Sequence, residues 1–249
     1  MLDQRYLIEA REVAVGYRGG PVVLDGVTLA VAGGQRVGIL GPNGGGKTTL
    51  IRALLGELTP RRGALVVDGR CGTVPQTERS RLDYPVSALD VVLMGVVGQG
   101  SWWRRPGRSD RADALDALER VGLRELARTT FGELSGGQRQ RVLVARALLQ
   151  DADVVLFDEP FTGLDAPSAD RLTGLIDTLA AEGRAVLVAT HDVSQTLEWD
   201  RILCLNGHQV AFGPPAETLT EDVLRATYGH ALVRLPSAGA FAVVGHPRG

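Results

Sequence analysis

One glycine-rich stretch with a single lysine decides the fold: Gly41-Pro42-Asn43-Gly44-Gly45-Gly46-Lys47-Thr48. The apolar run Val37–Leu40 comes directly before it and is typical of a buried strand. A helix with an apolar face opens at Thr49 and stops at Gly56. The stretch fits the spacing G-x-x-x-x-G-K-S/T in the context which that pattern requires, so the sequence predicts a strand–loop–helix unit here.

This loop has the chemistry of a phosphate cradle. Glycines let consecutive backbone N–H groups turn inward around a phosphate, and the helix start adds the positive end of its dipole. Lys47 is the one lysine among 27 basic residues, and its compact ammonium can reach the β- and γ-phosphates of a nucleotide. The Thr48 hydroxyl can ligate Mg²⁺. We therefore expect residues 41–49 to bind a nucleoside triphosphate.

The composition excludes several classes of protein. Of 249 residues, 44% are hydrophobic and 22% are charged, which is typical of a globular chain. The net charge of −2 disfavours a broad cationic face, so no nucleic-acid partner is expected. The N-terminus lacks the apolar core of a signal peptide, and no apolar run approaches the roughly 20 residues of a spanning helix. Cys71 and Cys204 have no CxxC partner, which excludes a disulfide framework or zinc site and fits a reducing cytoplasm.

The order of apolar runs predicts an α/β chain. Runs that are apolar throughout, such as Val154–Phe157 and Ala185–Ala189, indicate strands buried on both faces of a parallel sheet. The early runs lie among turn signals and favour an antiparallel N-terminal sheet. Further strands are expected at Val13–Val15, Val27–Val31, Val37–Leu40, Ala64–Val67 and Ile202–Leu205.

Helical patterns alternate with these strands and dominate one region. The apolar positions between Leu172 and Leu179 predict a helix that stops at Gly183. A largely helical insert is expected at about 85–150, with Ser109 as the cap of one of its helices. We expect one domain over residues 1–229 and a weakly patterned tail over residues 230–249.

Two carboxylates end the apolar run Val154–Phe157. Successive strand residues point to opposite sides, so Asp158 and Glu159 can do different work. Asp158 is expected to hold Mg²⁺, and Glu159 is expected to polarise the water that attacks the γ-phosphate, as a general base. An apolar strand that ends in acids is common, and its significance here comes from its pairing with Lys47.

A second candidate anion site lies at Leu134-Ser135-Gly136-Gly137-Gln138. Ser135 is expected to be the N-cap of the helix that follows, and Gly136 and Gly137 are expected to expose backbone N–H groups beside Gln138. An ordinary serine cap is the alternative interpretation. Two phosphate cradles in one chain suggest two contacts with ATP, the second serving the nucleotide of a neighbouring copy.

These motifs together resemble the nucleotide-binding subunits of ATP-binding cassette (ABC) transporters over residues 5–229. The fold that the resemblance implies is α/β: a P-loop NTPase (RecA-like) core with an N-terminal antiparallel β-subdomain and a helical insert. ATP and Mg²⁺ are the implied cofactors. Four more site residues are implied: Tyr17 stacking on adenine, Gln76 sensing Mg²⁺ and the γ-phosphate, Asp165 crossing a dimer interface, and His191 contacting the γ-phosphate.

Taken alone, Tyr17 fits packing on the antiparallel sheet better, and His191 fits a hydrogen-bonded residue at a helix start. The order of these residues along the chain favours the functional interpretation. The resemblance also implies a homodimer that sandwiches two ATP molecules, integral-membrane permease subunits, and a substrate-binding protein reached indirectly. The implied location is cytoplasmic, on the inner face of the membrane.

The insert gives a weaker indication of the substrate. The segment from Asp83 to Gly95 is similar to ABC subunits of importers for manganese, zinc or iron, with importers of iron chelates, haem or cobalamin close to them. Trp102 and Trp103 precede two arginines, and they fit docking of the membrane partner and packing of the insert equally well. An ABC protein acting on DNA or ribosomes, or a small-molecule kinase, is the competing class.

Overall fold

The computed structural model describes residues 5–75, 85–97, 106–229, 232–234 and 241–243. Its centre is a six-stranded sheet in the order β5-β6-β7-β3-β8-β9. Every neighbouring pair from β5 to β8 is parallel, and β9 runs antiparallel along the edge strand β8. The strands are β5 (Cys71–Val74), β6 (Val154–Asp158), β7 (Ala185–Thr190), β3 (Arg36–Leu40), β8 (Arg201–Leu205) and β9 (Gln209–Gly213).

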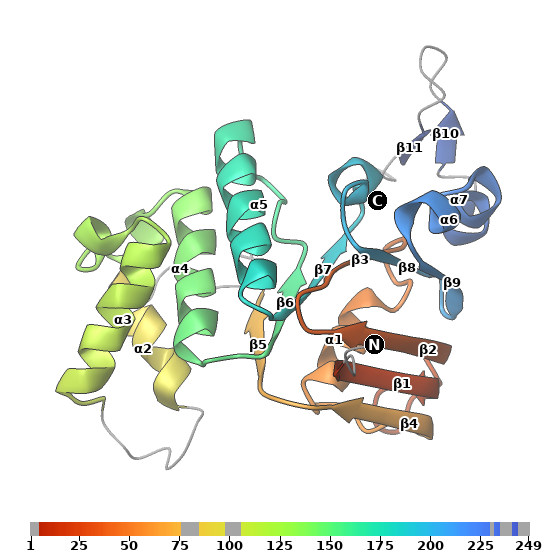
Figure 1. Cartoon of the computed structure of the whole chain (residues 1–249), viewed down its shortest axis with the longest axis horizontal. Coiled ribbons are helices and arrows are strands. Elements are labelled where there is room, and N and C mark those ends of the chain that lie inside the picture. Colours follow the sequence, from red (N-terminus) through yellow and green to blue (C-terminus); the bar gives the residue numbers. More distant parts are fainter. Residues whose placement is uncertain (1–4, 76–84, 98–105, 230–231, 235–240, 244–249) are drawn as a thin grey trace.

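A second, three-stranded sheet is antiparallel, as the turn signals predict. Its order is β2-β1-β4, with β1 at Tyr6–Val15, β2 at Leu24–Ala32 and β4 at Arg62–Val67. It lies beside α1 (Lys47–Leu54), on the same side of the main sheet (Figure 1). Side chains of β1, β2 and α1 form one apolar cluster with Leu156 and Leu187 of the main sheet.

Helices cover the other face of the main sheet. The helical region consists of α2 (Ala88–Val97), α3 (Arg108–Arg120) and α4 (Gly136–Leu149), with two short helical turns between α3 and α4 (Figure 1). Together with α5 (Ala166–Ala181), it forms a core cluster that includes Val155 and Phe157 of β6. Because side chains alternate across a strand, β6 sends residues 155 and 157 to this cluster and residues 154 and 156 to the opposite one.

The last described elements lie beyond β9. They are α6 (Pro215–Thr218), α7 (Glu221–Tyr228) and a hairpin of β10 (Leu232–Arg234) and β11 (Phe241–Val243). Leu224 and Tyr228 of α7 pack on Leu40 and Cys204 of the main sheet. The weakly patterned tail therefore includes a paired strand element that the sequence did not indicate. The domain boundary at residue 229 stays a prediction.

The expectation for Ser109 was wrong. The N-cap of α3 is Gly107, whose backbone N–H donates to the Asp110 carboxylate at 2.6 Å, and Ser109 lies inside the helix. An aspartate three residues along satisfies the first free N–H group, so a serine cap is not needed. Every strand that the sequence predicts is present, while β5, β9, β10 and β11 were missed.

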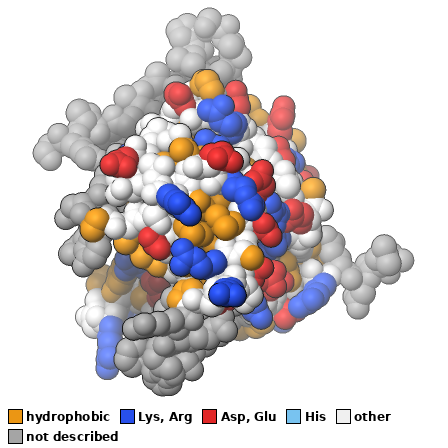
Figure 2. Space-filling view, turned by 90° about the vertical axis from the view of Figure 1, so that its left-hand side faces the viewer, with side chains coloured by type: hydrophobic (Ala, Val, Ile, Leu, Met, Phe, Trp, Pro, Cys, Tyr) orange, Lys and Arg blue, Asp and Glu red, His pale blue; other side chains and the backbone are white. Residues whose placement is uncertain are grey.

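The outer face of the helical region carries charges of both signs. Figure 2 shows basic and acidic side chains interspersed there around a small apolar area. This mixture agrees with the low net charge. Among the helices of the described residues, none combines the length and apolar character that a membrane-spanning segment needs.

Shortening Leu156 tests the central position of β6. This side chain is fully buried, so we expect Leu156→Ala to lower the free energy of unfolding by roughly 2–5 kcal/mol. Leu197→Ala is the matched control, because Leu197 is 58% exposed and its truncation should change stability by no more than about 0.5 kcal/mol. Urea unfolding measures both variants. Equal losses would contradict the assignment of β6 to the core.

Candidate functional site

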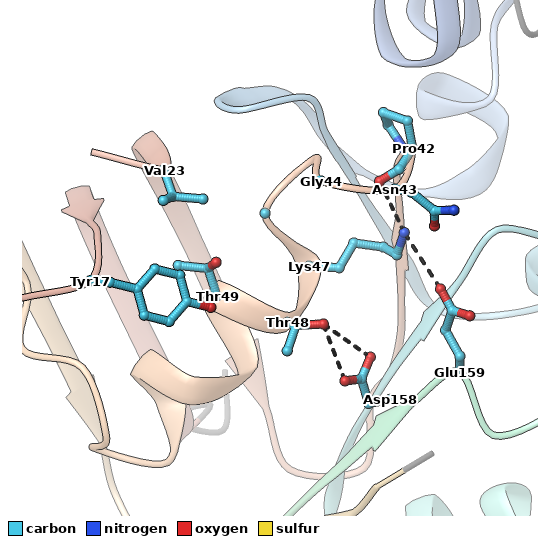
Figure 3. A pocket seen from close by; sticks show the side chains of 11 residues that line it. Tyr17, Val23, Pro42, Asn43, Gly44, Lys47, Thr48, Thr49, Asp158 and Glu159 are labelled. Carbon is cyan, nitrogen blue, oxygen red and sulfur yellow. Dashed lines mark hydrogen bonds and ion pairs between the residues drawn. The ribbon is translucent and has the colours of Figure 1, made fainter. Parts of the chain in front are cut away.

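The parallel arrangement brings three chain segments to one edge of the sheet. The glycine-rich loop follows β3, Asp158 and Glu159 lie at the end of β6, and His191 follows β7, which runs between those two strands. The loop and the two carboxylates line a cleft of about 480 Å³, within the roughly 300–1,000 Å³ typical of small-molecule sites (Figure 3). Its lining is formed by Tyr17, Val23, Pro42, Asn43, Gly44, Gly46, Lys47, Thr48, Thr49, Asp158 and Glu159.

The loop needs its glycines for two different reasons. Gly44 and Gly46 have φ angles of 79° and 101°, a left-handed conformation that L side chains rarely adopt. Gly41 lacks space instead, because a Cβ there would overlap the carbonyl oxygen of Leu205. The turn after β8 supports the loop further, since the Gly207 N–H donates to the Gly45 carbonyl at 3.0 Å.

Lys47 is buried at the floor of the cleft. Its Nζ donates to the carbonyl oxygens of Gly41 at 2.7 Å and Pro42 at 3.2 Å, and it lies 3.8 Å from Oε1 of Glu159 (Figure 3). Burial lowers the pKa of Lys47, while the carboxylates of Glu159 and Asp158 act in the opposite direction. The ammonium is therefore hydrogen-bonded to carbonyl oxygens of its own loop. A phosphate group that enters the cleft would offer it a negatively charged partner.

Thr48 and Asp158 form a pair of hard oxygen ligands. The Thr48 hydroxyl donates to the Asp158 carboxylate, with 3.2 Å between Oγ1 and Oδ2. Asp158 lies on the face of β6 that carries Val154 and Leu156, which is the face covered by α1. Strand alternation thus directs this carboxylate to the start of α1, where it fits a Mg²⁺ ion shared with phosphate oxygens.

Glu159 leaves the strand by an unusual backbone conformation. Its φ angle is +50°, which costs a non-glycine residue roughly 1–3 kcal/mol, and its N–H donates to the Ala189 carbonyl at 2.9 Å. The carboxylate consequently lies between two cationic or titratable groups. Its Oε1 is 3.8 Å from the Lys47 ammonium, and its Oε2 is 3.9 Å from Nδ1 of His191. This strained conformation at the predicted general base has no signal in the sequence.

Tyr17 is 40% exposed at the rim of the cleft. Two arginines that the sequence did not single out hold this residue. The guanidinium of Arg52 lies 5.7 Å from the ring centroid, a cation–π contact, and Arg61 donates to the Tyr17 carbonyl at 2.6 Å. Arg52 lies in α1 and Arg61 lies just before β4, both remote from Tyr17 in sequence, so only the fold reveals their role.

The helix cap at the second predicted anion site is formed as expected, by residues that do not line the cleft. Ser135 is the N-cap of α4: its hydroxyl accepts from the Gln138 N–H at 3.2 Å, and Gln138 Oε1 accepts from the Ser135 N–H at 2.8 Å. Asp165 caps α5. The cleft lining includes none of Ser135, Gly136, Gly137, Gln138 and Asp165. Gln76, Trp102 and Trp103 lie outside the described residues.

A strand–loop–helix phosphate cradle on a parallel sheet, with a buried lysine opposed by an Asp-Glu pair, defines the chain as a P-loop ATPase. The family model described as "ABC transporter" matches residues 24–162. The chain belongs to the ABC transporter family. The predicted fold class and the predicted ATPase activity are thereby confirmed.

Two curated relatives and one solved structure illustrate the similarity. The manganese transport system ATP-binding protein MntB of Bacillus subtilis is 41% identical, with 92% of this chain and 94% of that protein covered. The zinc transport system ATP-binding protein TroB of Treponema pallidum is 39% identical, with 90% and 87% covered. A solved chain of an inward-facing ABC transporter, assigned to the metal-chelate type, has 29% identity and a TM-score of 0.83 with 96% of each chain covered.

Replacing Lys47 tests the cradle directly. We expect Lys47→Ala to weaken ATP binding roughly 10- to 150-fold, because the phosphates lose a charged hydrogen-bond donor. Lys47→Arg should bind less well than the parent, since a planar fork does not fit the same place. Titration with a fluorescent ATP analogue measures the dissociation constants. Unchanged affinity in Lys47→Ala would contradict the site, and Arg11→Ala, an exposed charge on β1, is the control.

Proposed function

We propose that this chain is the ATP-hydrolysing subunit of an importer for a divalent metal ion, manganese, zinc or iron. The proposed ATPase mechanism rests on the position of the Glu159 carboxylate between Lys47 and His191. The metal substrate is supported by identities of 41% and 39% to manganese and zinc transport subunits over nearly the whole chain.

In the proposed catalytic cycle, Thr48, Asp158 and Gln76 would hold Mg²⁺, which would supply positive charge beside the phosphates. The loop amides and Lys47 hold the β- and γ-phosphates, and Tyr17 stacks on adenine. Glu159 accepts a proton from the attacking water, and His191 donates a hydrogen bond to the γ-phosphate. Two copies are proposed to enclose two ATP molecules, each between the loop of one copy and residues 135–138 of the other, with Asp165 crossing the interface.

The separation of the two predicted phosphate sites supports this dimer. Ser135 caps α4 and is exposed to solvent, yet it does not line the cleft of its own chain. A second copy facing the cleft would supply the missing side. Closure on ATP and reopening after hydrolysis would then drive permease subunits in the membrane, with this chain on their cytoplasmic face and a substrate-binding protein reached only through them.

The Glu159→Gln variant tests the proposed base. We expect it to bind ATP normally, to accumulate as an ATP-bound dimer, and to lose roughly 10²–10⁴-fold in turnover, because an amide cannot accept the proton. Phosphate release and sedimentation velocity measure the two effects. Hydrolysis close to that of the parent would overturn the assignment of Glu159.

Uptake measurements test the substrate. A strain that lacks this chain should lose uptake of labelled Mn²⁺, Zn²⁺ or iron, and the Glu159→Gln variant should fail to restore it while the parent chain succeeds. Loss of iron-chelate, haem or cobalamin uptake alone would favour those substrates over a free metal ion. Co-purification with ribosomes or DNA, and not with an integral-membrane protein, would contradict the transport function.

A further inference from the structure

The two glycines of the 135–138 segment lie in different surroundings. Gly136 is partly exposed, and a methyl group there would lie 4.0 Å from the nearest neighbour, Cδ2 of Leu164. Gly137 is buried, and a methyl group there would lie 2.5 Å from the hydroxyl oxygen of Ser168 and 2.7 Å from its Cβ. Position 137 therefore has no room for a side chain, whereas position 136 has room for a methyl group.

Backbone conformation does not explain Gly137. It lies in the first turn of α4, where alanine would be more favourable than glycine by about 1 kcal/mol, and it is not among the glycines with positive φ. Rotation of the Ser168 hydroxyl would relieve only part of the overlap, because Cβ is fixed to the backbone of α5. The absence of a side chain at Gly137 thus allows α5 to approach the start of α4 closely.

Ser168 is at the same time bound to Asp165. Its backbone N–H donates to Oδ1 of Asp165 at 3.1 Å and to the Asp165 carbonyl at 3.1 Å. The pKa of Asp165 is lowered most by a hydrogen bond with the Ser168 side chain, and next by the hydrogen bond from the Ser168 backbone N–H. One residue therefore contacts both the Asp165 turn and Gly137.

We propose that Ser168 is a positioning residue, which joins the start of α4 to the Asp165 turn so that both meet a partner copy as one rigid unit. The proposal rests on the ATP-sandwich dimer of the proposed function. The two segments belong to different elements, α4 and α5, and Leu164, which also lies next to both glycines, completes the contact. A subunit in which this contact is broken would still bind ATP in its own cleft, because no residue of the contact lines it.

The test is a rescue experiment in the Glu159→Gln background. We expect Gly137→Ala to raise the ATP concentration for half-maximal dimerisation roughly tenfold, since overpacking displaces α4 from α5. The added Ser168→Gly removes the overlapping atoms and should return the double variant to within about threefold of Ser168→Gly alone. Sedimentation velocity measures dimerisation, and fluorescent ATP-analogue binding to the monomer should stay unchanged throughout.

Gly136→Ala is the matched control. It adds the same methyl group one residue earlier, without overlap, so Ser168→Gly should not rescue any defect that it causes. Dimerisation of Gly137→Ala equal to the parent, or a defect that Ser168→Gly leaves unchanged, would overturn the proposal. The second result would mean that Gly137 is required by the nucleotide itself.

Two further measurements cover the remaining outcomes. If Gly137→Ala does not fold, Ser168→Ala removes only the hydroxyl. It should weaken dimerisation while ATP-analogue binding is preserved, and normal dimerisation would contradict the proposal.

If the Glu159→Gln parent itself does not dimerise with ATP, the proposed function fails, and the contact is then tested by thermal unfolding. Gly137→Ala should lower Tm and Ser168→Gly should restore it, and a Tm unaffected by Gly137→Ala would refute the contact.

Discussion

The buried ammonium of Lys47 is the charge on which the rest of the site depends. A desolvated cation is costly unless it has close partners, and here two loop carbonyls and the Glu159 carboxylate provide them. The Glu159 carboxylate is within reach only because β3, β7 and β6 are parallel neighbours that end at one edge of the sheet. Continuous apolar strands, buried on both faces, thus fix the position of a charge that no local segment could stabilise alone.

The same sheet divides the molecule into two surfaces with separate tasks. One face carries α1 and the antiparallel sheet, which together form the cleft and its aromatic rim. The other face carries α5 and the helical region, on which Ser135 and Asp165 cap two adjacent helices (Figure 1). Alternation along β6 links the two, because residues 154 and 156 belong to the first core and residues 155 and 157 to the second. In the proposed dimer, a nucleotide site with this division is completed when two copies face one another.

Much of this arrangement could be predicted from the sequence where a strong local pattern exists. The runs at Val154–Phe157 and Ala185–Ala189 are apolar throughout, and the Ser135 cap has a glutamine three residues on, so both predictions were confirmed. The strand β5 was missed because Cys71-Gly72-Thr73-Val74 is short and only half apolar, and it becomes a strand through pairing with β6. The cap of α3 was wrongly assigned because Ser109 and Asp110 offer competing hydrogen-bond acceptors.

The features that no sequence pattern could show depend on contacts between distant segments. The positive φ of Glu159, the arginines around Tyr17 and the Gly207–Gly45 hydrogen bond are of this kind. So is the difference between Gly136 and Gly137, two neighbours with identical chemistry and different space. Such features refine the geometry of a site whose existence the motifs already indicate.

The account is tested most directly by a crystal structure of the Glu159→Gln subunit with Mg²⁺ and ATP. It predicts two copies facing one another, with the γ-phosphate held on Lys47 of one copy within hydrogen-bond distance of Ser135 Oγ of the other. A structure in which ATP and Mg²⁺ occupy the Lys47 loop while Ser135 of every neighbouring copy stays far from the nucleotide would contradict it.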